Sequence, residues 1–186
     1  MTEITLPSLA PDIRLFGKVS ETMLSEFFRQ QAETQPSRAV VLELSTSGGD
    51  ADVGRRIAQE IRLWREKEGC ELFFLGKTYV YSAGITIMSG FPKSHRFLTQ
   101  DCELLIHERK LKKELHLDGA LRGCLSVVND LLAQIESGQR LEKQGFEELV
   151  KGSSLSAQAL IDKVYAKDWY LTGSEALELG LVQGLI

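Results

Sequence analysis

The chain has 186 residues, of which 43% are hydrophobic and 26% are charged, and its formal net charge is −4. This length predicts one domain spanning residues 1–186, and the composition excludes disordered, collagen-like and coiled-coil chains. This slightly negative net charge does not favour binding to nucleic acid or to an anionic membrane surface.

The N-terminal sequence and the cysteine spacing indicate in which cellular compartment the protein is expected. The opening MTEITLPSLAP has neither the basic start nor the apolar run of a signal peptide. No window holds the roughly 18 uncharged apolar residues that a membrane span needs. Cys70, Cys102 and Cys124 are odd in number and widely spaced, which matches neither a metal template nor a disulfide framework. We therefore expect a cytoplasmic protein with reduced, mostly buried thiols.

The first elements alternate between strand and helix. Residues 12–17 predict a strand, and the face formed by Met23, Leu24, Phe27 and Phe28 predicts a helix over residues 20–32, closed by Pro36. Residues 39–45 form a continuous apolar run, which is typical of a strand covered on both faces. The segment STSGGD then predicts a glycine turn before the next helix.

The middle of the chain repeats this alternation. A helical face of Val53, Ile57, Ile61 and Trp64 ends at Gly69, a residue suited to a helix C-terminus. Residues 71–76 predict another buried strand. Residues 79–90, YVYSAGITIMSG, predict a strand that turns into a buried helix.

The last part of the chain adds short strands and a long helix. Residues 96–100 and 102–108 predict two short strands, and residues 180–186 predict a final one. A long helical stretch begins at Asp118, a second helix is expected within residues 154–166, and Thr172 and Glu175 have capping-box spacing before a third. The long stretch has an apolar stripe of Leu121, Leu125, Val128, Leu132 and Ile135. This order predicts an α/β fold with a largely parallel sheet.

Several residues could carry chemistry, although none is decisive alone. The adjacent Gly48 and Gly49 let the backbone approach a ligand, but a plain tight turn explains them as well. Ser82 lies at a strand-to-helix junction, where a serine commonly acts as a helix N-cap. His107 ends an apolar strand and could project into a cleft, whereas His95 and His116 lie in polar surroundings. Asp168 precedes the WYL segment and could orient an imidazole or be a surface residue.

Taken together, four segments resemble the proteolytic subunit of Clp protease, a serine peptidase family with the crotonase-like fold. They are LSTSGGD, YSAGITIMSGF, ELLIHE and KDWYLTGSEALELGLV, which occur in the family's order along almost the whole chain. The resemblance implies an α/β fold of repeated β-β-α units with a mostly parallel sheet and a long protruding helix, the handle. The handle region is expected within residues 110–160, and residues 1–11 form a short N-terminal segment.

The resemblance also implies an activity and a set of roles. Ser82 is the expected nucleophile, His107 the base and Asp168 the residue that orients the base. The backbone N–H groups of Gly49 and Ala83 are the expected oxyanion hole, in agreement with the need for two convergent donors. The implied reaction is hydrolysis of peptide bonds in short or unfolded polypeptides, without a metal or cofactor. The implied partner is the chain itself in a ring-type homo-oligomer.

The chain also departs from the family's pattern. Ser47 and Arg109 stand where prolines are usual, Trp169 replaces a frequent arginine, and ERKLKKELHLDG replaces a glycine-rich strand. The stretch from His107 to Asp168 is longer than the family's. The family's N-terminal docking elements correspond to only about ten residues here, so a Clp-type ATPase partner stays an open question. We expect the chemistry to be kept and the assembly to be altered.

Three other functions remain open from the sequence. A crotonase-class acyl-CoA enzyme could use the same two N–H groups on the same fold. A peptidase with a Ser–Lys dyad would use Lys77 or Lys110 in place of His107. A non-catalytic ring subunit would keep the fold and lose turnover.

Overall fold

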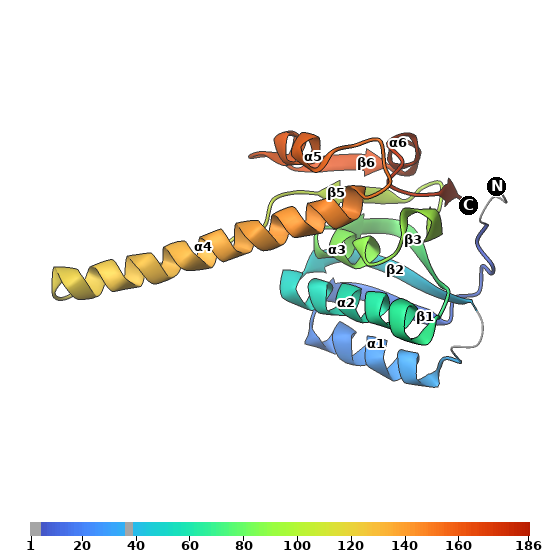
Figure 1. Ribbon diagram of the computed structural model, residues 1–186, viewed down its shortest axis with the longest axis horizontal. Helices are drawn as coiled ribbons and strands as arrows, with labels where there is room; N and C mark the ends of the chain where they lie inside the picture. Colours follow the sequence, from blue (N-terminus) through green and yellow to red (C-terminus); the bar gives the residue numbers. More distant parts are fainter. Residues whose placement is uncertain (1–4, 36–38) are drawn as a thin grey trace.

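A computed structural model describes residues 5–35 and 39–186, which form a seven-stranded, mostly parallel sheet with helices packed on it (Figure 1). The strand order is β1-β2-β3-β4-β7, with β5 joined to β3 and β6 joined to β5. Only the β5–β6 pair is antiparallel among the described strands. The strands are β1 (Ile13–Val19), β2 (Val40–Gly49), β3 (Leu72–Tyr81), β4 (Arg96–Leu98), β5 (Glu103–Ile106), β6 (Trp169–Thr172) and β7 (Gly184–Leu185). The helices are α1 (Glu21–Glu33), α2 (Ala51–Glu68), α3 (Ala83–Ser89), α4 (Leu121–Val150), α5 (Ala157–Val164) and α6 (Gly173–Glu178), with a 3₁₀ turn at Lys93–His95.

The predicted α/β fold with a mostly parallel sheet and a long helix is confirmed, and most predicted elements are present. Helix α2 ends at Gly69, which has the left-handed φ of 65°, and Thr172 and Glu175 form the predicted capping box of α6. The expected closure of α1 by Pro36 lies outside the described residues. The predicted final strand over residues 180–186 is limited to Gly184–Leu185.

The predicted glycine turn is wrong, because β2 continues through it. Gly48 and Gly49 are paired with Lys18 and Val19 of β1. The register between β1 and β2 shifts between Phe16 and Lys18, at a bulge that includes Gly17 with a φ of 82°. The bulge lets the strand pair extend, so the glycines stand at the end of the sheet.

Strand β3 forks the sheet. Residues 74–76 pair with β4, whereas residues 79–81 pair with β5. Between them the register against β2 shifts, and Thr78 has a positive φ of 60°. The strand predicted at residues 71–76 and the strand part of the segment predicted at residues 79–90 are therefore one bent strand. The second branch of the fork supports β5 and β6.

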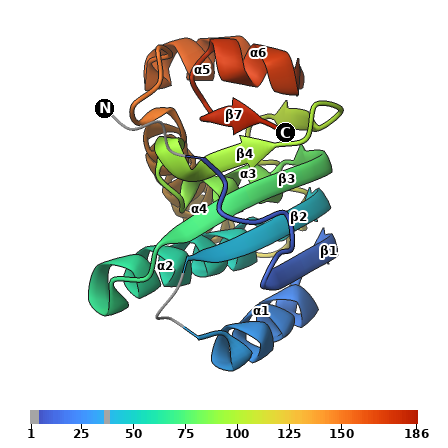
Figure 2. The ribbon, with the colours of Figure 1, turned by 90° about the vertical axis from the view of Figure 1, so that its right-hand side faces the viewer.

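Two apolar layers flank the sheet. The larger layer lies between the strands and the helices and includes Phe27, Ile57, Phe74, Met88 and Leu160, all buried. The smaller layer consists of Val41, Phe73, Leu75 and Phe97. Leu6 and Ala39 pack against this second layer. Figure 2 shows the N-terminal segment, in dark blue, crossing the sheet on its way to β1.

Helix α4 protrudes far from the body, as the predicted handle does (Figure 1). Of its 30 residues only Phe146, Leu149 and Val150 are buried. Its base is held by Arg96, which is 1% exposed. The guanidinium donates to the carbonyl oxygens of Phe91 at 2.9 Å, Leu149 at 2.7 Å, Leu181 at 3.2 Å and Glu148 at 3.4 Å. Arg96 therefore joins the end of α4 to β4 and to the turn before β7.

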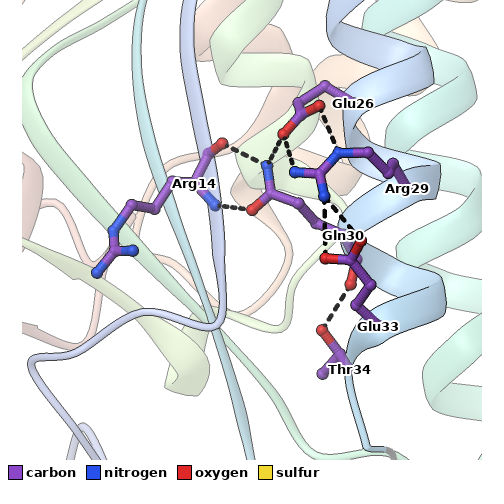
Figure 3. Close-up of polar contacts among 6 residues, drawn as sticks. All are labelled: Arg14, Glu26, Arg29, Gln30, Glu33 and Thr34. Atoms are coloured by element: carbon purple, nitrogen blue, oxygen red, sulfur yellow. Dashed lines mark hydrogen bonds and ion pairs between the residues drawn. The ribbon is translucent and has the colours of Figure 1, made fainter.

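A side chain blocks the free edge of the sheet. The amide of Gln30 on α1 accepts a hydrogen bond from the N–H of Arg14 at 2.7 Å and donates to its carbonyl at 2.9 Å (Figure 3). Glu26 accepts from the same amide and from Arg29, which also pairs with Glu33. Because edge strands offer unpaired backbone groups to other chains, this contact protects β1 from strand-to-strand association at Arg14.

The described residues contain no helix with the length and apolar character that spanning a membrane requires. Cys70 and Cys102 are buried and Cys124 is half-buried, so the thiols are mostly buried, as expected. Burial raises the pKa of Cys102 to about 12, so this thiol is not a nucleophile near neutral pH.

Candidate active site

The ends of three strands lie where most of the predicted site residues are found. Gly49 ends β2, Ser82 follows β3 and His107 follows β5. Tyr81 is the partner of Leu105 in the parallel β3–β5 pair, and the N–H of Ser82 donates to the carbonyl of Leu105 at 2.8 Å. The sheet register therefore brings the serine and histidine segments together, although 24 residues lie between Ser82 and His107 in the chain.

Ser82 has a strained backbone. Its φ of 56° and ψ of −116° lie in a region that non-glycine residues seldom adopt, and its side chain makes no capping hydrogen bond to α3. Ser82 therefore occupies the predicted N-cap position of α3, but its hydroxyl does not cap the helix. Strain of this kind costs of order 1–3 kcal/mol and is concentrated at functional sites, where it orients a reactive group.

The close approach of Ser82 requires a glycine at position 48. A Cβ atom on Gly48 would lie 2.6 Å from the Cβ of Ser82 and 2.9 Å from the carbonyl oxygen of Tyr81. Its φ of 92° also disfavours any side chain. The glycine pair is therefore explained by close approach to the serine segment as well as by backbone conformation.

Thr46 supports the glycine segment and was not singled out from the sequence. Its hydroxyl is buried, donates to the carbonyl oxygen of Gly17 at 2.5 Å and accepts from the N–H of Gly48 at 3.0 Å. One side chain thus joins the β1 bulge to the glycines. A buried threonine in a strand has no distinctive sequence signal, because β-branched residues are common there.

A cavity of about 380 Å³ joins the predicted residues, with the exception of Gly48 and Asp168. Its wall includes Gly49, Ser82, Ala83 and His107. The lining is completed by residues from the start of α2, from α3, from the loop after β5 and from α4, namely Asp50, Ala51, Asp52, Arg55, Ile85, Thr86, Glu108, Arg109, Lys110, Leu141, Glu142, Gly145 and Phe146. The predicted nucleophile, the predicted base and two residues of the predicted oxyanion hole therefore line one cavity.

His107 is half-buried, and its Nδ1 atom is hydrogen-bonded to the carbonyl oxygen of Glu108 at 2.5 Å. Because a carbonyl can only accept, Nδ1 carries the proton in this contact. The neutral ring then has its lone pair on Nε2, which is the atom that a general base uses. The other two histidines lie elsewhere: His95 packs on Phe73 with ring centroids 4.6 Å apart, and His116 is exposed.

Asp168 lies outside the cavity but close to His107 in the sheet. Ile106 is the partner of Trp169 in the antiparallel β5–β6 pair, so His107 and Asp168 lie just beyond the last rung of that pair. The Asp168 carboxylate accepts from the Lys110 ammonium at 3.0 Å. This hydrogen bond, with smaller electrostatic contributions from Lys110 and His107, lowers the pKa of Asp168.

The two lysines considered for a Ser–Lys dyad both have carboxylate partners. Lys77 pairs with Glu43 at 2.7 Å and is absent from the lining of the cavity. Lys110 lines the cavity but pairs with Asp168. Each of the two ammonium groups is thus paired with a carboxylate.

Three charged side chains that sequence reasoning missed tie down the loop after His107. The N–H of Arg109 donates to the carboxylate of Glu142 on α4, and the Arg109 guanidinium pairs with Asp52 on α2 at 3.0 Å. Glu108 accepts from the N–H of Ala166 at 2.8 Å. These contacts join segments that are far apart in the sequence, so no local pattern could have identified them.

Comparisons with known proteins identify the family of the chain. The family model described as Clp protease matches residues 10–186. The chain is 24% identical over 180 residues to the "ATP-dependent Clp protease proteolytic subunit 2" of Treponema pallidum (strain Nichols), covering 94% of this chain and 81% of that protein. Its fold is similar to that of a mutant of ClpP1 from Listeria monocytogenes, with a TM-score of 0.71 and 16% identity over 94% of this chain and 90% of the other. The chain belongs to the Clp protease family, as a relative of its proteolytic subunits.

Proposed function

We propose that this protein is a serine peptidase that hydrolyses peptide bonds in short or unfolded polypeptides. The observation that carries the proposal is the cavity shared by Ser82, His107, Gly49 and Ala83. The strained backbone of Ser82 adds support, because it presents the hydroxyl at a strand-to-helix turn in the manner of activated serines.

The chemistry follows from these groups. The Ser82 hydroxyl attacks the peptide carbonyl while Nε2 of His107 takes its proton. The N–H groups of Gly49 and Ala83 stabilise the oxyanion of the tetrahedral intermediate. The imidazolium then protonates the leaving amine, and a water activated by the same imidazole releases the acyl group from Ser82.

Asp168 is the third member of the proposed triad. Its position beyond the rung formed by Ile106 and Trp169 supports this role. To act on the imidazole, its carboxylate has to exchange the Lys110 ammonium for Nδ1 of His107, which in turn has to leave the carbonyl of Glu108. Exposed ion pairs contribute only about 0–1 kcal/mol, so the Lys110 contact is a small barrier to this exchange.

In this proposal the protein acts as a homo-oligomer whose copies contact one another along α4. Leu121, Leu125 and Leu132 are 87%, 59% and 52% exposed on this helix, and Val128 and Ile135 extend the same stripe. A stripe of this length on a helix that protrudes from the body is suited to burial against a second copy. The family supports ring assembly and partnership with a Clp-type ATPase in general terms, and both remain proposals for this chain.

A fluorophosphonate probe tests the proposed activity. We expect it to modify Ser82 alone, because the Ser82 hydroxyl shares the cavity with the proposed base and the proposed oxyanion hole. Ser82→Ala is expected to abolish the label, and His107→Ala to abolish most of it, whereas Ser94→Ala outside the cavity leaves it intact. Mass spectrometry across a range of protein concentrations identifies the adduct. An assembled protein without an adduct on Ser82 would favour a non-catalytic ring subunit.

A further inference from the structure

The loop that carries His107 has no regular secondary structure to hold it. Strand β5 ends at Ile106, and α4 begins only at Leu121. Yet a general base must keep its ring within hydrogen-bond reach of the nucleophile, and a displacement of 1 Å can cost about a hundredfold in rate. The contacts of residues 108–110 with the rest of the chain therefore decide where the imidazole lies.

One of these contacts reaches the main chain of the loop from the handle helix. The carboxylate of Glu142 accepts from the N–H of Arg109, two residues after His107. Glu142 is half-buried and lines the same cavity as Ser82 and His107. It also lines a neighbouring cavity of about 570 Å³ between the loop and α4. Its carboxylate therefore lies at the junction of the loop, the handle and the site.

The other contacts of residues 108–110 with distant segments hold side chains, while the main-chain carbonyl of Glu108 is bonded to the adjacent His107 ring. Asp52 binds the guanidinium of Arg109, and Lys110 binds Asp168. Glu108 binds the N–H of Ala166. A long side chain transmits position poorly because it has several rotatable bonds, whereas a bond to the Arg109 N–H fixes the backbone directly.

We propose that Glu142 is a positioning residue for the proposed peptidase, which holds the loop at Arg109 and thereby sets the orientation of the His107 ring. The expected effect on catalysis rests on the proposed function. The expected effect on the position of the His107 ring does not. In this proposal α4 is coupled to the site, because a shift of the handle moves Glu142 and, through the bond to Arg109, the backbone beside the His107 ring.

The proposal distinguishes the hydrogen bond from the charge. Glu142→Gln keeps an acceptor oxygen for the Arg109 N–H and removes the charge, whereas Glu142→Ala removes both. Alanine favours helix and the position is partly exposed, so the variant is expected to fold. Glu136→Ala removes an exposed carboxylate from the same helix and is the matched control.

On a fluorogenic peptide we expect Glu142→Ala to lower kcat by roughly ten- to a hundredfold with little change in KM, because the loss is one of alignment. Glu142→Gln is expected to retain most of the activity, and Glu136→Ala all of it. A Glu142→Ala variant with wild-type kcat would overturn the proposal, as would equal losses in Glu142→Ala and Glu136→Ala.

A second measurement does not depend on turnover. In protein labelled with ¹⁵N-histidine, the ring nitrogen shifts of His107 report which nitrogen carries the proton, and only His95 and His116 share the spectrum. We expect Glu142→Ala to move the His107 shifts toward a mixture of tautomers and to leave the other two unchanged. If the His107 shifts change while Ser82 resists the probe, the positioning role stands and the peptidase proposal fails. Unchanged His107 shifts in Glu142→Ala would refute the positioning role, whatever the protein's activity.

Discussion

Replacing Arg96 by methionine is expected to destabilise the protein strongly. The guanidinium is buried and donates to four main-chain carbonyls, two of them at the end of α4. A hydrogen bond from a charged donor contributes roughly 1.5–3 kcal/mol, and the two bonds shorter than 3 Å are the strongest of the set. Methionine fills much of the volume but leaves these carbonyl oxygens buried without their donor.

The cost of burying the Arg96 charge offsets part of the stabilisation that these hydrogen bonds provide. Desolvation lowers the pKa of Arg96 to about 10, so the charged form is costly in its site. We expect a net loss of about 3–5 kcal/mol for Arg96→Met, as for other buried charged networks from which one partner is removed. In a chain of this size each kcal/mol lowers Tm by roughly 2–4 °C, so the expected decrease is of order 10 °C.

Thermal unfolding followed by circular dichroism measures this loss. Arg140→Met replaces an exposed arginine on α4 and is expected to melt within about 1 °C of the parent, since surface substitutions rarely exceed 0.5 kcal/mol. Hydrogen exchange should also show reduced protection at residues 146–150 in Arg96→Met. If Arg96→Met melts together with Arg140→Met, the reasoning that Arg96 anchors the handle is wrong.

Three further substitutions test the site and the assembly. Gly48→Ala is expected to reduce fluorophosphonate labelling at least tenfold with the fold retained by circular dichroism, because the new methyl group would overlap Ser82, and normal labelling would contradict the close approach. Asp168→Asn is expected to lower kcat about 10⁴-fold if the carboxylate orients the imidazole, and a near-normal rate would reduce Asp168 to a surface partner of Lys110. Leu125→Glu, and likewise Leu132→Glu, should shift the sedimentation profile toward smaller species and weaken peptidase activity with it, because a charge on a buried stripe is costly. If the protein is a monomer at micromolar concentration and still cleaves peptides, both the proposed assembly and its link to catalysis are wrong.

Local patterns in the sequence determined the elements whose contacts are local. The face of Val53, Ile57, Ile61 and Trp64 and the left-handed Gly69 are sufficient to define α2. The capping box of Thr172 and Glu175 is likewise a contact between residues three positions apart. The order of strands and helices then limits the fold to an α/β sheet, because each apolar face needs an opposing layer.

Only the tertiary structure decided how these elements join at the site. The extension of β2 through Gly48 and Gly49 depends on its register with β1, and the fork of β3 depends on two different partners. The strain at Ser82, the contact of Asp168 with Lys110 and the bond from Arg109 to Glu142 all depend on residues brought together from distant segments. Contacts of this kind leave no periodicity in the sequence, because burial and register in three dimensions select them.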